Sequence, residues 1–271
     1  MQKLIVDADK KSFGINLKEL RHYKDLFYIL AYRDIRVRYA QTFLGFLWAF
    51  LQPAATLLIF ILVFGLAIQI DTGGVPYPLF AICGISMWSY FSFVLNQSGN
   101  SIIGAQEMIK KIYFPRLVVP LSKAVVGFVD FGVALLFLVI LMFAYQFPPS
   151  PYLWLAPAFM LLNIIAALGV GIWLSALSIR YRDFQHVIPF LVQFGLYATP
   201  VAYPARLVPE KYLWVYNLNP MAGIIEGFRW SILGGTPPDE YFWISFAVII
   251  ILFVTSLIYF RSVEDTMADI V

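Results

Sequence analysis

The chain has 271 residues, of which 61% are hydrophobic and 13% are charged, and its mean hydropathy is +0.78. Because soluble domains carry about 25% charged residues, this composition excludes an ordinary soluble enzyme and predicts an integral membrane protein. The single cysteine, Cys83, excludes an intrachain disulfide framework, and the two histidines, His22 and His186, lie too far apart in sequence to suggest a metal site.

Residues 1–45 are predicted to form a polar, basic cytoplasmic segment that contains one amphipathic helix. Leu20, Phe27 and Leu30 recur at roughly helical spacing among lysines and arginines. This pattern is typical of a helix in the membrane interface, with its apolar side toward acyl chains and its cations toward anionic head groups. The alternative is a solvated helix packed on another domain. The polar start of the chain does not resemble a cleavable signal peptide.

Six apolar runs follow, and each is predicted to span the membrane, because a helix needs about 20 mostly apolar residues to cross a bilayer. Five of them contain no Asp, Glu, Lys or Arg, and one run is short and broken by Pro189 and Pro200. The predicted fold is therefore all-α, with spans over 46–70, 79–95, 117–145, 152–179, 187–203 and 241–260 and a cytoplasmic tail over 261–271.

Lysine and arginine are distributed unequally between the segments that connect these runs. Fifteen lie in the segments before the first span, after the second and fourth spans and after the last, whereas three lie in the segments on the opposite side. By the positive-inside rule, both termini are cytoplasmic. The net charge of +3 is therefore a signal of topology, and no nucleic-acid site is expected.

The cytoplasmic segment between the second and third spans is predicted to dock on a partner. Glu107–Phe114 forms a short helix in this interpretation, and Pro115 ends it. A helix of two turns is not stable alone in water, so it needs a partner surface. An apolar face with a basic rim suits a groove of a soluble subunit. A plain positive-inside loop would explain the lysines, but it would not require the apolar residues, which are Met108, Ile109, Ile112 and Tyr113.

The segment before the last span is predicted to fold as a re-entrant helical hairpin over 212–233 on the external side. Asn219 and Pro220 are typical of a helix start, and Gly234-Gly235 of a helix end. The enclosed helix of about 13 residues is too short to cross and too apolar for water. Glu226 and Arg229 lie three residues apart, so they are expected to pair on one face.

Asp130 lies near the middle of the third span, and an intramembrane carboxylate is a functional candidate by default. It could act as a proton or ion relay, or it could make a structural hydrogen bond to a neighbouring helix; we favour the structural role because one lone carboxylate makes a poor relay. Lys123 is about 10 Å away along the helix axis, too far for direct pairing. The chain has no Gly-Lys pair for a phosphate loop and no HExxH, GxSxG or CxxC motif, so no catalytic residues are expected.

Several motifs, in this order, resemble the membrane subunits of ABC type-2 exporters, in particular the O-antigen and teichoic-acid polysaccharide permeases. They are RDIRVRYAQTFLGFLWAFLQP (33–53), KKIYFPRLVVPLS (110–122), SIRYRDF (178–184) and NLNPMAGIIEGFRWSILG (217–234). The resemblance implies a multi-pass protein of a bacterial cytoplasmic (inner) membrane, present as a homodimer bound to two ATPase subunits that hold ATP and Mg, with no cofactor in this chain.

The same resemblance implies roles for particular residues. Glu107–Arg116 would be the coupling helix that docks on the ATPase, and helices within 212–233 would form the external gate. A lipid-linked glycan would thread between the protomers. The coupling helix comprises Glu107, Met108, Ile109, Lys110, Lys111, Ile112, Tyr113, Phe114, Pro115 and Arg116, and the cytoplasmic entrance comprises Arg38, Tyr39, Phe43, Leu44 and Gly45.

The many aromatic residues agree with a glycan substrate. Sugars pack their C–H faces on rings, and Tyr and Trp keep a polar tip for hydroxyls. Both residues are also enriched at membrane interfaces, which is the alternative explanation for Trp88, Tyr90 and Tyr197, the candidate path residues. The competing functions are export of a smaller amphiphile or drug by the same kind of exporter, an ion-coupled flippase that uses Asp130, and a passive membrane scaffold.

Overall fold

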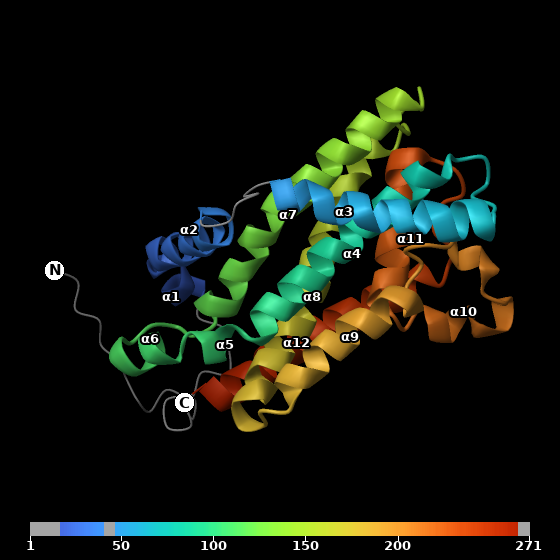
Figure 1. Cartoon of the computed structure of the whole chain (residues 1–271). Helices are drawn as coiled ribbons and strands as arrows, with labels where there is room; N and C mark the ends of the chain where they lie inside the picture. The colour runs from blue at the N-terminus through green and yellow to red at the C-terminus, as the bar shows by residue number, and fades with distance from the viewer. Residues whose placement is uncertain (1–16, 41–46, 265–271) are drawn as a thin grey trace.

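The computed structural model describes residues 17–40 and 47–264, and all regular structure in these ranges is helical (Figure 1). Five helical segments are long and apolar enough to cross a membrane. The all-α membrane fold is confirmed. The five segments are α3 with η1 (Leu47–Phe60 and Ile61–Ala67), α4 (Tyr77–Gly99), α7 (Val118–Ala144), η2 with α8 (Leu153–Leu155 and Ala156–Arg180) and α12 (Phe242–Glu264).

The sixth expected span, 187–203, differs from the prediction. Helix α9 (Phe184–Ala198) begins earlier and has only 15 residues, so it is about 22 Å long at 1.5 Å per residue. It ends where Thr199 turns to an extended conformation. Thr199 precedes Pro200, and the proline ring disfavours helical geometry in the residue before it. In Figure 1, α9 nevertheless runs from the end of α8 toward the opposite end of the bundle.

Helix α4 is the centre of the bundle. It packs against α3, α7, α8, α9 and α11. Most of its side chains are buried, and large side chains such as Leu79, Ile82, Met87 and Tyr90 are almost completely so. The helices approach closely where small residues meet: a Cβ added at Gly171 of α8 would lie 2.7 Å from Ser98 Cβ of α4. In a bilayer there is no hydrophobic driving force between helices, so their association depends on van der Waals packing, and small residues allow the backbones to approach closely enough for it.

The short elements gather at the two ends of the bundle (Figure 1). One end carries α1 (Leu17–His22), α2 (Lys24–Ala40), α5 (Ser101–Gly104), α6 (Gln106–Lys111) and the last turn of α12. The other carries η3 (Ala205–Leu207), α10 (Glu210–Tyr216) and α11 (Pro220–Leu233). The lysine-rich segments share the first end, as the positive-inside rule requires of a cytoplasmic side.

Helix α2 is helical as predicted, and part of its apolar surface packs on the protein itself. It packs along α7. Leu30 is buried in the protein core, and Leu20 and Phe27 pack against that core. Other large apolar side chains of α2 are exposed, namely Tyr28, Ile29, Tyr32 and Val37. The spacing indicated a helix with one apolar face, and tertiary packing on α7 decided what covers that face.

Candidate functional site

The expected coupling helix is shorter in the structure than in the prediction. Helix α6 ends at Lys111, and Ile112 is extended, with φ −135° and ψ 139°. The prediction of helix through Phe114 was therefore wrong. Pro115 cannot donate a backbone hydrogen bond and restricts the residue before it, so the chain leaves helical geometry several residues ahead of the proline.

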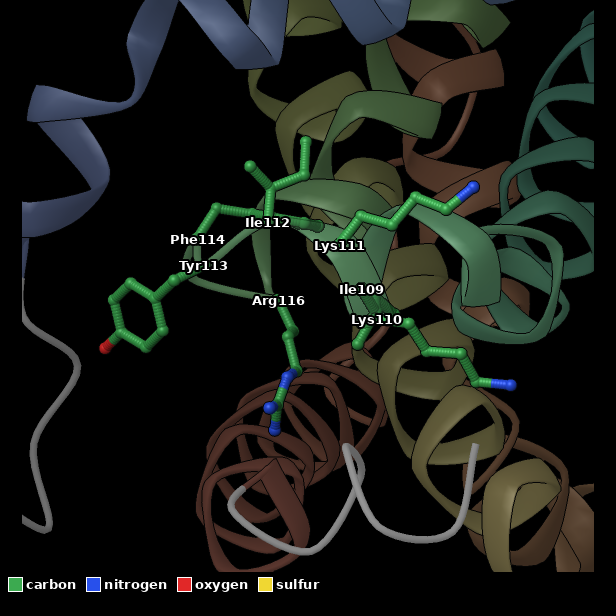
Figure 2. Close-up of a pocket in the computed structure, with 7 residues that line it drawn as sticks. All are labelled: Ile109, Lys110, Lys111, Ile112, Tyr113, Phe114 and Arg116. Atoms are coloured by element: carbon green, nitrogen blue, oxygen red, sulfur yellow. The ribbon is translucent and has the colours of Figure 1, made fainter.

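This segment divides its side chains between the bundle and the outside (Figure 2). Ile109 and Phe114 are buried, whereas Lys110, Lys111 and Tyr113 are exposed. Figure 2 shows Tyr113 directed away from Lys110 and Lys111. All three residues line a cavity of about 270 Å³. The single docking face expected from the sequence is thus divided. Two of its four apolar residues, Met108 and Ile109, pack on the protein's own core, and the other two, Ile112 and Tyr113, are exposed.

The coupling segment is tied to the last helix. The backbone N–H of Arg116 donates to Oε1 of Glu264 over 3.0 Å. The other carboxylate oxygen of Glu264 pairs with Nη1 of Arg261 at 2.6 Å. Glu264 is largely buried, so the hydrogen bond from Arg116 links the start of α7 to the end of α12 without much solvent screening.

Two ion pairs join α2 to α7. Asp130 accepts from Nη2 of Arg38 and from the hydroxyl of Tyr39, each at 2.5 Å. One turn earlier on α2, Asp34 pairs with Lys123 of α7. Burial, and then the hydrogen bond to Asp130, raises the pKa of Tyr39, so its hydroxyl stays protonated and donates.

These pairs neutralise Asp130 and Lys123, the two charged residues of the third span. Both oxygens of Asp130 are engaged by α2, which is the geometry of a hydrogen bond to a neighbouring helix. Lys123 does not reach Asp130, as expected, and takes its counter-ion from Asp34. A cavity of about 250 Å³ lies beside these residues. Of the expected entrance residues, Arg38 and Tyr39 belong to this cluster, and Phe43, Leu44 and Gly45 lie outside the described residues.

The helix expected before the last span forms, and its ends carry the signals read from the sequence. The side chain of Asn219 accepts from the backbone N–H of Met221 over 3.0 Å, so it caps α11. Gly234 and Gly235 follow the helix with φ of 77° and 88°, a region that favours glycine. Helix α11 is largely buried and packs against α4, α8 and α12.

Arg229 of α11 is a buried cation that joins three parts of the chain. Its Nε donates to the carbonyl of Phe80 at 3.1 Å, and its Nη2 donates to the carbonyl of Val201 at 2.5 Å. Its Nη1 lies 3.3 Å from Oε1 of Glu226, the partner expected from the spacing. A Cβ added at Gly84 would lie 2.5 Å from Nη2, so glycine leaves the space that the guanidinium occupies.

Comparisons with known proteins identify the family. Residues 25–233, well over half of the chain, match the ABC-2 type transporter family. The chain belongs to this family. The permease is 30% identical over 247 residues to the O-antigen export system permease protein RfbA of Klebsiella pneumoniae, covering 91% of this chain and 95% of the relative.

Two further relatives share much of the permease. The polysialic acid transport protein KpsM of Escherichia coli is 28% identical over 210 residues, 75% of this chain and 79% of its own. The inner membrane transport permease YadH of Escherichia coli K12 is 25% identical over 193 residues, 67% of this chain and 74% of its own. The permease is thus a multi-pass transmembrane subunit that partners ABC ATPase subunits; it carries no cofactor, and nucleotide binds to the ATPase.

The candidate path aromatics occupy different environments in the permease. Tyr90 is buried between α4 and α7, where its hydroxyl donates to the carbonyl of Ala124 at 3.0 Å. Trp88 is also buried. Packing within one protomer covers both rings. Tyr197 is 66% exposed on α9 and stays a candidate.

Sequence reasoning missed the contacts that span long separations. A lysine within an apolar run needs a counter-ion, so the sequence could have predicted that Lys123 is paired. It could not have identified Asp34 as the partner, because Asp34 is 89 residues away. Gly84 gave no signal that distinguished it from other helical glycines. Its role depends on the position of Arg229, which only the packed structure shows.

Proposed function

We propose that this permease exports a lipid-linked polysaccharide, of O-antigen or teichoic-acid type, across the cytoplasmic membrane of a bacterium with energy from ATP. The observation that carries the proposal is the 30% identity to an O-antigen export permease over 91% of the chain. The similarity to a polysialic acid transport protein extends the support to a second polysaccharide exporter.

The transport path in this proposal lies between two copies of the permease. The centre of a single protomer is filled by α4, whose large side chains are buried, so it leaves little room for a polymer. The apolar surface of α3 and η1 is largely exposed, including Leu58, Ile59, Leu62 and Leu66. Lipid or a second copy must cover such a surface, and a homodimer would cover part of it.

Helix α9 completes a sixth crossing in this proposal. It has about 22 Å of helix against a hydrocarbon core of about 30 Å. Thr199 continues the chain in an extended conformation, and Phe190, Phe194 and Tyr197 leave an aromatic surface exposed on this helix. A broken crossing of this kind is tolerated where it faces protein or a water-filled path, which fits a position beside the channel.

The exposed part of the coupling segment would receive the force from the ATPase. Lys110, Lys111, Ile112 and Tyr113 form this part, and Ile109 and Phe114 fix it to the bundle. The hydrogen bond from Arg116 to Glu264 would pass its displacement to α12. A short exposed segment with buried anchors on either side suits this task, because it moves together with the helices behind it.

The experiment uses the permease reconstituted with its ATPase in proteoliposomes, with glycan export and ATP hydrolysis measured in parallel. Tyr113→Ala should lower export several-fold at unchanged permease level, because the contact with the ATPase is lost. Tyr145→Ala, an exposed tyrosine at the far end of α7 from this segment and outside the expected gate, is the control. Normal coupling in Tyr113→Ala with the complex intact would refute the assigned role of this segment.

The same preparation separates ATP-driven export from an ion-coupled flippase. Export should need ATP and should persist after the proton gradient is collapsed. The engagement of both Asp130 oxygens by Arg38 and Tyr39 supports this expectation, because a relay needs a carboxylate that is accessible to protons. Export that stops when the gradient collapses would favour the flippase.

A further inference from the structure

The external end of the permease holds a cavity that the export path between protomers does not explain. It measures about 540 Å³, within the range of about 300–1,000 Å³ typical of small-molecule sites. The α10–α11 hairpin forms one side, and the residues from Gly234 to Asp239 form another. In Figure 1 this region lies at the opposite end of the bundle from α6, the side on which an exported chain emerges.

One wall of the cavity presents a charged pair that is held in place. Arg229 lines the cavity and is fixed by its bonds to Phe80, Val201 and Glu226. Oε1 of Glu226 accepts from Arg229 and from the backbone N–H of Ala205. Oε2 of Glu226 makes no hydrogen bond to any residue in the described ranges, so it is an acceptor available to a hydroxyl group.

Aromatic rings line the cavity together with this pair. Trp230 stacks on Tyr152, with ring centroids 4.6 Å apart and planes inclined by 25°. The ring of Phe80 lies against the guanidinium of Arg229, and Phe242 is a further ring in the lining. A saccharide needs this combination, because its C–H faces pack on rings while its hydroxyls need fixed polar groups.

The charges of the lining restrict the ligand further. Two cations, Arg206 and Arg229, stand against three carboxylates, Glu210, Glu226 and Asp239. This balance disfavours phosphate groups and acidic sugars through like-charge repulsion. A metal ion is also disfavoured, because the described residues contain no group of three His, Cys, Asp or Glu side chains that could hold one.

We propose that this cavity binds a neutral sugar unit of the exported glycan on the external side. The inference rests on the proposed function, since the sugar is taken to come from the polymer being exported. Each protomer would hold one such site beside the exit. A bound unit there would disfavour backward sliding of the chain between transport steps.

The test measures binding of neutral disaccharides to the full-length permease in lipid nanodiscs by saturation-transfer NMR and calorimetry. Mannobiose and chitobiose are the neutral probes, and digalacturonate is the acidic probe. Leu213→Trp fills the cavity from α10, and Thr236→Trp narrows it from the exposed loop. Val215→Trp is the matched control, because it lies on α10 but outside the cavity lining.

Wild type and Val215→Trp should bind at least one neutral disaccharide saturably, and both filled variants should bind it at least about tenfold more weakly. Digalacturonate should bind more weakly than the neutral probes. The inference is overturned if wild type binds neither neutral probe, if both filled variants bind normally, or if the acidic probe binds as tightly.

Export assays on the same preparations distinguish failure of the sugar site from failure of the proposed function. ATP-driven glycan export by wild type without disaccharide binding would remove the sugar site and leave the proposed function standing. Disaccharide binding that depends on the cavity, without ATP-driven glycan export, would remove the proposed function and leave a saccharide site of another purpose.

Discussion

Arg229→Met is the substitution whose effect the structure defines most sharply. Methionine keeps much of the side-chain length but removes every hydrogen-bond donor. The carbonyls of Phe80 and Val201 each lose their charged donor, and Glu226 loses its counter-ion. Hydrogen bonds to a charged group contribute about 1.5–3 kcal/mol each, so losing the two bonds to these carbonyls costs on the order of 3–5 kcal/mol. The charge left on Glu226, which is 30% exposed, adds a smaller cost.

This cost converts to a measurable change in thermal stability. At about 2–4 °C per kcal/mol for a chain of this size, Arg229→Met should lower the melting temperature by about 6–20 °C. The measurement is the fraction of detergent-solubilised protein that stays monodisperse after heating. Arg206→Ala is the control, because Arg206 makes an exposed ion pair with Asp71, which should contribute little.

A double variant tests the physical reason for the loss. Glu226→Gln removes the orphaned charge but keeps an acceptor for the backbone N–H of Ala205. Glu226→Gln combined with Arg229→Met should therefore be more stable than Arg229→Met alone, which is a non-additive result. A double variant no more stable than the single one, or an Arg229→Met loss no larger than that of Arg206→Ala, would refute the reasoning.

Three further predictions follow from individual contacts. Gly84→Ala should destabilise the protein in the same melting assay, because its Cβ would lie 2.5 Å from a buried guanidinium nitrogen and 2.7 Å from a backbone carbonyl, whereas Gly132→Ala, with nothing within 4 Å, should not. Asp130→Asn should weaken the docking of α2, so that hydrogen–deuterium exchange of α2 amides quickens about tenfold while that of α10 is unchanged. The backbone N–H of Gly73 and the guanidinium of Arg206 lower the pKa of Asp71. The stabilisation that they give is therefore present above the usual aspartate pKa and lost as the pH falls through the lowered pKa. The small difference in melting temperature between wild type and Asp71→Asn should accordingly disappear in acid.

The sequence predicted the long helices because each depends on a local property. Five of six spans were recognised from about 20 consecutive apolar residues, which any membrane crossing requires. The start of α11 at the Asn219 cap and its end at Gly234 were also predicted from neighbouring residues in the sequence. The sixth span was less accurate, because the effect of Pro200 on Thr199 set where α9 ends.

The sequence could not predict what each apolar face or aromatic ring contacts, because these contacts depend on packing between distant segments. The apolar side of α2 was assigned to lipid, but α7 covers Leu30. Tyr90 was a candidate for the path; in the structure it is buried, and α7 supplies its hydrogen-bond acceptor. A sequence pattern shows that a face is apolar or that a ring is present. The shape of the bundle decides whether lipid, substrate or another helix lies against it.

The charged residues of the bundle suggest how its two ends are organised for transport. Toward the end that carries α6, Asp34 and Asp130 tie α2 to α7, and Glu264 ties the start of α7 to α12. Toward the end that carries α10, Arg229 ties α11 to α4 and, with Glu226, to the segment after α9. A force on the coupling segment would therefore move α2, α7 and α12 together. The helices at the other end would receive this force through α12 and α4, because α11 packs on both.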